Sequence, residues 1–130
     1  GQMAPTTLIG MKTSTTPEGR AVDTQGFPFR ITELIAMLPG AHYVTRQSVH
    51  TPNAVRQFKK ALTKAFTYQK QKKGYCLIEV VSNCPSGWKM TPIEANKWME
   101  QNMFPIYPIG DIKLDGTLIE KHTARKESPQ

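Results

Sequence analysis

Residues 74–88 read GYCLIEVVSNCPSGW, and this stretch decides which fold the sequence predicts. Its first part, Tyr75 to Val81, is a nearly continuous apolar run that only Glu79 interrupts. A run of this kind is typical of a strand buried on both faces, as in a parallel sheet covered by helices. The second part, residues 82–88, is rich in turn-forming residues and predicts a loop at the carboxyl end of that strand.

A strand and a helix are predicted directly before this stretch. Residues 42–49 are rich in β-branched and aromatic side chains, which favour β structure. Residues 52–73 are expected to form a helix that Thr51 caps, with Pro52 at its first position and Gly74 at its end. Two strands connected by one helix pair in parallel, with a right-handed connection. The sequence therefore predicts an α/β fold with a parallel sheet flanked by helices.

The rest of the chain is expected to supply shorter elements. One helix is predicted over residues 30–38, and another begins at Thr91, where Thr-Pro-Ile-Glu is a capping-box sequence. Residues 1–28 predict an extended loop, and residues 111–130 predict a polar tail that is partly disordered. We therefore expect one domain over residues 1–110.

The two predicted strands make too small a sheet for a free-standing α/β domain. We expect the sheet to be incomplete at its front, and the chain to be the second half of a longer protein. An incomplete sheet exposes an edge and an apolar face, so self-association or poor solubility is expected. The chain has no signal peptide and no apolar run near the roughly 20 residues that span a bilayer, which predicts a cytoplasmic protein.

The excess positive charge lies on one predicted helix. The net charge is +7, from 17 lysines and arginines against 10 aspartates and glutamates. Seven of the basic residues fall within residues 51–73, which contain no acidic residue, so the remainder of the chain is neutral. The mostly apolar face predicted for this helix consists of Val55, Phe58, Leu62, Ala65, Phe66 and Gln69. The lysines are then either a solvated outer face or a docking face for an acidic partner.

Few residues are candidates for chemistry. The three histidines lack the spacing of metal ligands, and the chain has no Cys-x-x-Cys, no phosphate-binding glycine-rich motif and no spacing that supports a Ser/His/Asp constellation. Cys84 follows the strand at its carboxyl end, where ligands of open parallel sheets bind. One thiolate cannot hold an iron–sulfur cluster, which normally needs four. The residues alone leave Cys84 either a half-buried bystander or a ligand.

Three segments, in the right order, resemble the beta subunit of 2-oxoacid:ferredoxin oxidoreductases. They are the amino-terminal Gly1-Gln2-Met3-Ala4-Pro5-Thr6-Thr7, residues 74–88, and residues 90–95 with the run that follows to Phe104–Gly110. Residues 26–50 also fit the resemblance. The first is similar to the segment just beyond the family's thiamine-diphosphate motif. The resemblance covers about residues 1–110 and is closer to the 2-oxoglutarate and branched-chain 2-oxoacid members than to the pyruvate enzymes.

The resemblance implies a fold, a reaction and a set of cofactors. The fold would be the C-terminal half of a thiamine-diphosphate-binding domain. The reaction would be oxidative decarboxylation of a 2-oxoacid to an acyl-coenzyme A, with electrons passed to ferredoxin. Cys84 matches the fourth ligand of the family's [4Fe-4S] cluster, and Gly1, Gln2 and Thr6 match the loop beside thiamine diphosphate.

The resemblance also implies that much of the site lies outside this chain. The segment that holds Mg²⁺ and the diphosphate, and three further cluster cysteines, would precede Gly1. The chain is therefore expected to contain no catalytic residue and to be inactive alone. The implied partners are an alpha subunit, with gamma and delta subunits as further candidates, and ferredoxin, for which residues 52–73 are a candidate docking face.

Two other interpretations stay open from the sequence. The chain could be a small basic module that binds nucleic acid through residues 52–73, although no stacking aromatic residue is expected among the lysines, which disfavours it. Steep salt dependence of DNA or RNA affinity would favour that interpretation. The chain could also belong to a structural subunit that keeps the fold and has lost the chemistry, which the iron content of the complete subunit would reveal.

Overall fold

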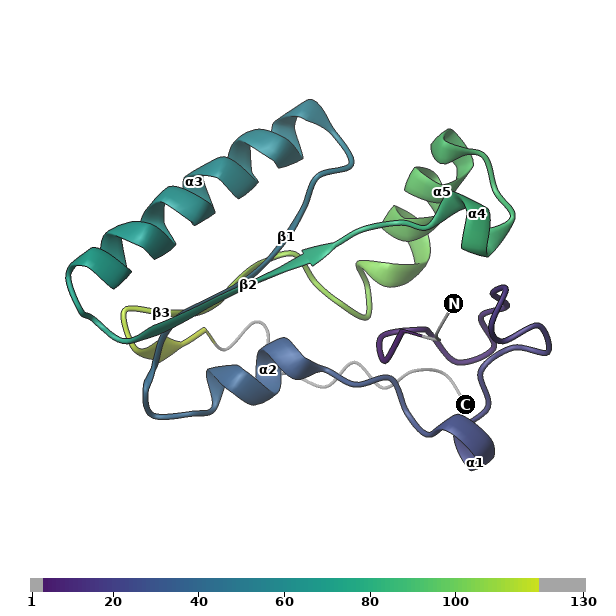
Figure 1. The fold of residues 1–130 in the computed structure, drawn as a ribbon, viewed down its shortest axis with the longest axis horizontal. Helices are drawn as coiled ribbons and strands as arrows, with labels where there is room; N and C mark the ends of the chain where they lie inside the picture. Colours follow the sequence, from purple (N-terminus) through teal and green to yellow (C-terminus); the bar gives the residue numbers. More distant parts are fainter. Residues whose placement is uncertain (1–3, 120–130) are drawn as a thin grey trace.

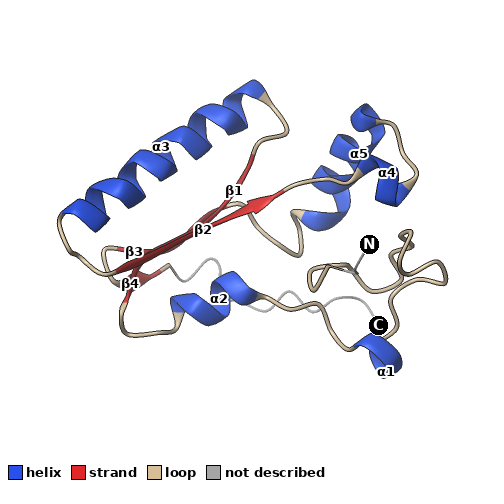
Figure 2. Cartoon of the chain, in the orientation of Figure 1, coloured by secondary structure: helices blue, strands red, loops and turns tan. Residues whose placement is uncertain are grey.

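The computed structural model describes residues 4–119 and contains one mixed sheet with helices on both faces (Figures 1 and 2). The strands are β1 (Ala41–Ser48), β2 (Tyr75–Val81), β3 (Gly110–Leu114) and β4 (Thr117–Leu118), in the order β2-β1-β3-β4. The helices are α1 (Val22–Gln25), α2 (Ile31–Ala36), α3 (Pro52–Lys70), α4 (Pro85–Trp88), α5 (Pro92–Trp98) and the π-helix η1 (Met99–Met103). The predicted α/β fold is confirmed.

The predicted parallel pair is present, but the sheet as a whole is not parallel. β1 and β2 pair in parallel over their length, with α3 as the connection. β3 runs antiparallel to β1, and β4 antiparallel to β3. The expected polar tail thus begins too early at residue 111, because Ile112 is fully buried in the core and Asp115-Gly116 forms the hairpin turn. The expected tail beyond residue 119 lies outside the described residues.

β2 is less buried than its apolar sequence predicts. Within residues 4–119 it pairs only with β1, so it is an edge strand. Tyr75 is 52% exposed and Val80 37%, while the side chains of residues 76–79 are half-buried. The prediction of a strand buried on both faces is therefore wrong for this part of the chain.

α3 begins and covers one sheet face as expected, but the stripe that packs inward matches the predicted one only in part. Ala65 is buried and Val55 and Phe58 are half-buried, as expected. The Thr51 hydroxyl accepts a hydrogen bond from the Ala54 amide at 3.1 Å, and Pro52 opens the helix. Ala61 and Ala65 are buried against the ring of Tyr43. These small side chains let the helix approach the sheet closely, which turns two larger ones outward. The exposed ones are Leu62 (37% exposed) and Phe66 (62% exposed), which the sequence assigned to the packed face.

The buried guanidinium of Arg46 joins the elements on the other face of β1. It donates to the Glu33 carboxylate of α2 at 2.6 and 2.9 Å and to the Glu79 carboxylate of β2 at 2.6 Å. The Thr32 hydroxyl also donates to Glu79. Burial opposes ionisation of Glu33, but hydrogen bonds from Arg46 and Arg30 outweigh it and hold the pKa of that carboxyl below its ordinary value. One cation thus ties α2, β1 and β2 together.

Replacing Arg46 should strongly destabilise the chain. Arg46→Leu leaves the half-buried Glu79 without its cation and Glu33 with Arg30 alone, and breaking a buried pair in this way costs about 3–5 kcal/mol. Urea denaturation of the 130-residue chain measures the loss. Arg56→Leu, on the exposed face of α3, should change the free energy of unfolding by less than about 0.5 kcal/mol. A similar small effect of Arg46→Leu would contradict the proposed importance of this cluster.

The same cluster predicts acid sensitivity. Because the pKa of Glu33 is lower in the folded chain than its ordinary 4.5, its ionised form stabilises the fold. That contribution is complete above about pH 4.5 and is lost as pH falls through the lower, folded-state value. Glu33→Gln should therefore flatten the fall in stability below pH 4.5, as measured by urea denaturation at stepped pH. Glu18→Gln, at an exposed position, should leave the profile of the native chain unchanged.

Candidate functional site

The loop after β2 presents Cys84 at the carboxyl end of the strand. Cys84 is exposed, carries a free thiol and stands at the amino-terminal cap of α4. Its carbonyl oxygen accepts a hydrogen bond from the Trp88 amide at 2.9 Å, which closes the single turn of α4. A Cβ atom on Gly87 would stand 2.8 Å from Sγ of Cys84, so a larger residue at position 87 would force the thiol to move. The sequence correctly placed Cys84 at this end of the sheet.

α5 holds this loop in position. The Asn83 side chain donates a hydrogen bond to the Asn96 side chain of α5. Trp88 packs against Trp98, with ring centroids 5.2 Å apart. The helix begins where the sequence predicts, because Thr91 and Glu94 form a complete capping box. The position of Cys84 therefore depends on α5 as well as on β2.

The amino-terminal loop lies against the Cys84 loop and is organised by one buried arginine. The Ser14 amide donates to the Gly87 carbonyl at 3.0 Å. Arg20 is 5% exposed and donates to main-chain carbonyl oxygens on both sides of it in the sequence. These acceptors are Ala4, Pro5, Thr7, Gln25, Gly26 and Phe27. Arg20 thus folds residues 4–27 into a defined shape, although the sequence gave no signal for this role.

A cavity of about 140 Å³ lies where the amino-terminal loop meets the end of β2. It is lined by Thr6, by Met103 and Tyr107, and by residues 79–82 of β2 and the following loop. The Tyr107 hydroxyl is buried and has no hydrogen-bond partner among residues 4–119. Burial raises the pKa of Tyr107 to about 12. The sequence predicted Thr6 as a site residue but missed Tyr107, whose isolated position between two prolines carries no recognisable motif.

The predicted site residues are only partly brought together. Thr6 and Ser82 line one cavity, and Cys84 follows Ser82 by two residues, so both predicted segments reach the carboxyl end of β2. Gly1 and Gln2 lie outside the described residues. Within residues 4–119, no group of three histidine, cysteine or acidic side chains could hold a metal ion. Cys84 therefore has no co-ligand in the part of the chain that the structure describes.

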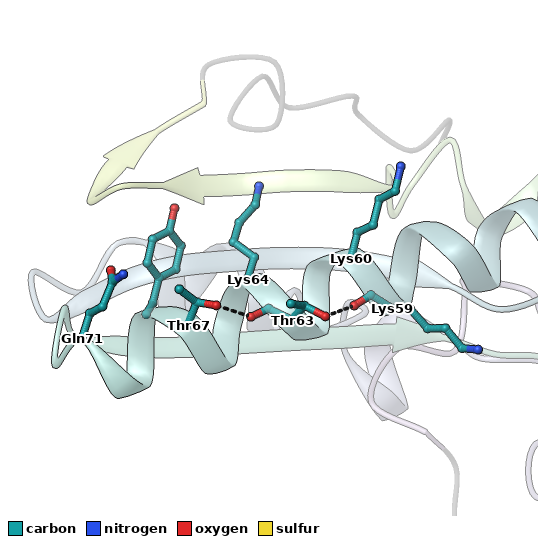
Figure 3. Close-up of a pocket in the computed structure, with 7 residues that line it drawn as sticks. Lys59, Lys60, Thr63, Lys64, Thr67 and Gln71 are labelled. Atoms are coloured by element: carbon teal, nitrogen blue, oxygen red, sulfur yellow. Dashed lines mark hydrogen bonds between the residues drawn. The ribbon is translucent and has the colours of Figure 1, made fainter.

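A second, basic groove runs along α3 on the side of the β3–β4 hairpin (Figure 3). It has a volume of about 600 Å³ and is lined by Lys59, Lys60, Thr63, Lys64, Thr67, Tyr68 and Gln71. Lys64 lies 3.4 Å from Asp111 and 5.1 Å from the centroid of the Tyr43 ring. The Tyr68 hydroxyl donates to Asp115 at 2.7 Å, which raises the pKa of Tyr68 to about 12. The hairpin therefore offsets part of the positive charge of this groove.

None of the helices within residues 4–119 has both the length and the apolar character needed to cross a membrane.

Comparison with known proteins identifies relatives but no matching family model or solved structure. The chain is 34% identical over 113 residues to the ketoisovalerate oxidoreductase subunit VorA of Methanothermobacter marburgensis, which covers 87% of the chain and 24% of that subunit. It is 36% identical over 102 residues to the 2-oxoglutarate synthase subunit KorB of Archaeoglobus fulgidus, covering 78% of the chain and 34% of the subunit.

The KorB subunit of Methanocaldococcus jannaschii matches the whole chain, at 30% identity over 139 aligned positions, and 47% of its own length is covered. The chain thus spans between about a quarter and about half of the length of these relatives. The match to several such subunits over most of the chain confirms the resemblance carried by its segments. The chain belongs to the family of 2-oxoacid:ferredoxin oxidoreductase subunits.

Proposed function

We propose that this chain forms one wall of the cofactor site in the thiamine-diphosphate-binding subunit of a 2-oxoacid:ferredoxin oxidoreductase. The observation that carries the proposal is the meeting of two distant segments at the carboxyl end of β2. One contains Thr6, which lines the cavity there, and the other contains Cys84. Ligands of open α/β sheets bind at this end of the strands. The names of the relatives, an oxidoreductase subunit and a synthase subunit acting on 2-oxoacids, support the same function.

The residues present fit part of the proposed cofactor set. An exposed, free thiol at Cys84 suits one of the four thiolates that hold a [4Fe-4S] cluster. Thr6, with Gly1 and Gln2 before it, would border thiamine diphosphate and its Mg²⁺. Thiamine diphosphate supplies the electron sink for decarboxylation when it is bound. The other three thiolates and the diphosphate site must come from chain beyond these residues, so the 130-residue chain alone is proposed to be inactive.

The proposed substrates follow the relatives' names. Ketoisovalerate and 2-oxoglutarate are the 2-oxoacids that those names contain. In the complete enzyme, coenzyme A would accept the acyl group and ferredoxin the electrons. An alpha subunit would supply the remaining substrate contacts, since this chain offers only one small cavity and one thiol at the proposed site.

The ligand role of Cys84 can be tested in the complete subunit. Cys84→Ser should remove most of the subunit's cluster iron, because three remaining thiolates hold a [4Fe-4S] cluster poorly. Iron content and the cluster's absorption measure the loss. Cys76→Ser is the matched control: its half-buried thiol lies within β2, 3.8 Å from the Gly74 carbonyl oxygen, and it should keep about four irons. Full iron content in Cys84→Ser would refute the assignment.

We also propose that the basic groove of α3 docks ferredoxin, whose surface is expected to be acidic. Lys59 and Lys60 are exposed and make no ion pair within residues 4–119, whereas Lys64 pairs with Asp111. Reversing Lys64 would therefore disturb a contact within the chain. The double variant Lys59→Glu/Lys60→Glu changes the groove without that complication.

In the assembled enzyme, Lys59→Glu/Lys60→Glu should lower kcat/KM for ferredoxin about tenfold at low salt and flatten its dependence on ionic strength. Turnover with an uncharged artificial electron acceptor should stay at the wild-type value. Lys12→Glu, on the exposed amino-terminal loop, is the control for a change of net charge. Unchanged ferredoxin kinetics at low salt would reject this docking site, and the nucleic-acid interpretation of α3 would then be tested by salt-dependent DNA or RNA affinity.

A further inference from the structure

A cavity of about 430 Å³, the β1–α3 cavity, opens where β1 passes into α3. Its walls come from the carboxyl end of β1, from the first turns of α3, and from η1 with the chain that follows it. β1, α3 and β2 form a parallel strand–helix–strand unit, and such units bind ligands at the carboxyl ends of their strands. The volume falls within the roughly 300–1,000 Å³ that is typical of small-molecule sites.

One buried polar side chain in this cavity is left without a full set of partners. Gln47 is 7% exposed. Its Nε2 donates to the Thr45 hydroxyl at 2.7 Å, and that hydroxyl donates to the Gly110 carbonyl at 3.0 Å, which fixes the orientation of the amide. Oε1 of Gln47 accepts no hydrogen bond within residues 4–119, and unlike the Tyr107 hydroxyl it is not fully enclosed by protein. Buried amide oxygens are normally paired, so this one suits a ligand that donates a hydrogen bond to it.

Two aromatic rings form another part of the wall. His50 contacts the Ser48 hydroxyl at 2.9 Å through Nδ1 and the Glu100 carboxylate at 2.7 Å through Nε2. Its ring lies against Phe104, with the ring centroids 5.2 Å apart. Because both nitrogens are engaged, His50 offers the cavity ring surface instead of a free polar atom. Ring surface of this kind suits a planar ligand.

The charges around the cavity favour an uncharged ligand. None of the described residues that line it is a lysine or arginine, and Glu100, the one carboxylate among them, is paired with His50. The positive end of the α3 dipole disfavours a cation. The remaining polar groups are the exposed amides of Asn53 and Gln57, each of which donates and accepts hydrogen bonds. The matching ligand is planar and neutral, with an amino group for Gln47 and an acceptor beside it.

We propose that the β1–α3 cavity binds a nucleoside whose base carries an exocyclic amino group, such as adenosine. The amino group donates to Oε1 of Gln47, and the neighbouring ring nitrogen accepts from an amide of Asn53 or Gln57. Asparagine and glutamine pair with adenine through such a donor and acceptor, and aromatic side chains stack on bases. This site stands on residues that the proposed cofactor site does not use, and it does not rest on the proposed function.

Equilibrium dialysis of the 130-residue chain against adenosine and inosine tests the base recognition. Inosine has a carbonyl and a ring N–H where adenosine has the amino group and the acceptor nitrogen, so it should bind at least tenfold more weakly. Because adenosine is uncharged, its affinity should be the same at low and high ionic strength. Equal affinity for the two nucleosides, or no binding of adenosine, would overturn the inference.

Two variants locate the site. Gln47→Leu removes the unpaired oxygen and should lower the affinity for adenosine at least tenfold. It also removes the hydrogen bond to Thr45, so a second variant separates binding from folding. Asn53→Ala/Gln57→Ala changes only exposed positions, and it should keep the native melting temperature while lowering the affinity at least fivefold. Native affinity in this double variant would reject the inference, whatever the effect of Gln47→Leu.

Controls on the same helix show whether the effect belongs to this cavity. Gln71→Ala, an exposed glutamine at the other end of α3, should bind adenosine as the native chain does. Lys59→Glu/Lys60→Glu should also leave the affinity unchanged, because neither lysine lines the β1–α3 cavity. A loss of adenosine binding in the lysine variant with native binding in Asn53→Ala/Gln57→Ala would place the nucleoside in the basic groove and overturn the assignment.

Discussion

The guanidinium of Arg46 is fully buried where α2, β1 and β2 meet. It lies on β1 and forms ion pairs with one carboxylate from α2, which Arg30 also contacts, and with one from β2. It also contacts the ring of Tyr107, in the turn that leads from η1 to β3. A buried cation can be accommodated only where its partners are complete, because an uncompensated charge in the interior is costly. This requirement constrains how α2, β1, β2 and the turn that contains Tyr107 pack together near one end of the sheet.

That end of the sheet is where the candidate site forms. Arg46 holds Glu79 near the end of β2, and the next residues of the chain pass the cavity and reach Cys84. Arg20 folds the amino-terminal loop so that Thr6 arrives at the same cavity. Both arginines act on groups distant in the sequence, one through carboxylates and the other through main-chain carbonyls. Buried cations therefore position the cavity, while α5 holds the Cys84 loop beside it.

The sequence predicts the features that depend on neighbouring residues. The helix caps at Thr51 and Thr91, the strand of residues 75–81 and the position of a cysteine in the loop after it all follow from local patterns. The antiparallel strand β3 was missed, because a five-residue strand inside a polar segment shows its role only when Ile112 meets the core. The cavity around Tyr107 was missed for a related reason. It joins side chains from three distant parts of the chain, and no spacing in the sequence encodes such a meeting.

Several apolar side chains that the sequence predicts to be buried are exposed in the structure. Leu62 and Phe66 of α3, and Tyr75 and Val80 of β2, have the composition of a core but lie at the surface of residues 4–119. Their apolar character predicts that these side chains are buried, but no other part of residues 4–119 covers them. Edge strands that stand alone usually carry charges or prolines that block pairing, and β2 has only Glu79, which Arg46 holds in an ion pair.

The relatives are two to four times as long as this chain, so the family's subunits contain further residues that can cover such a surface. On the function proposed above, the open β2 edge and the single thiol of Cys84 would both follow from one arrangement, in which further residues of the complete subunit pack at the carboxyl end of β2.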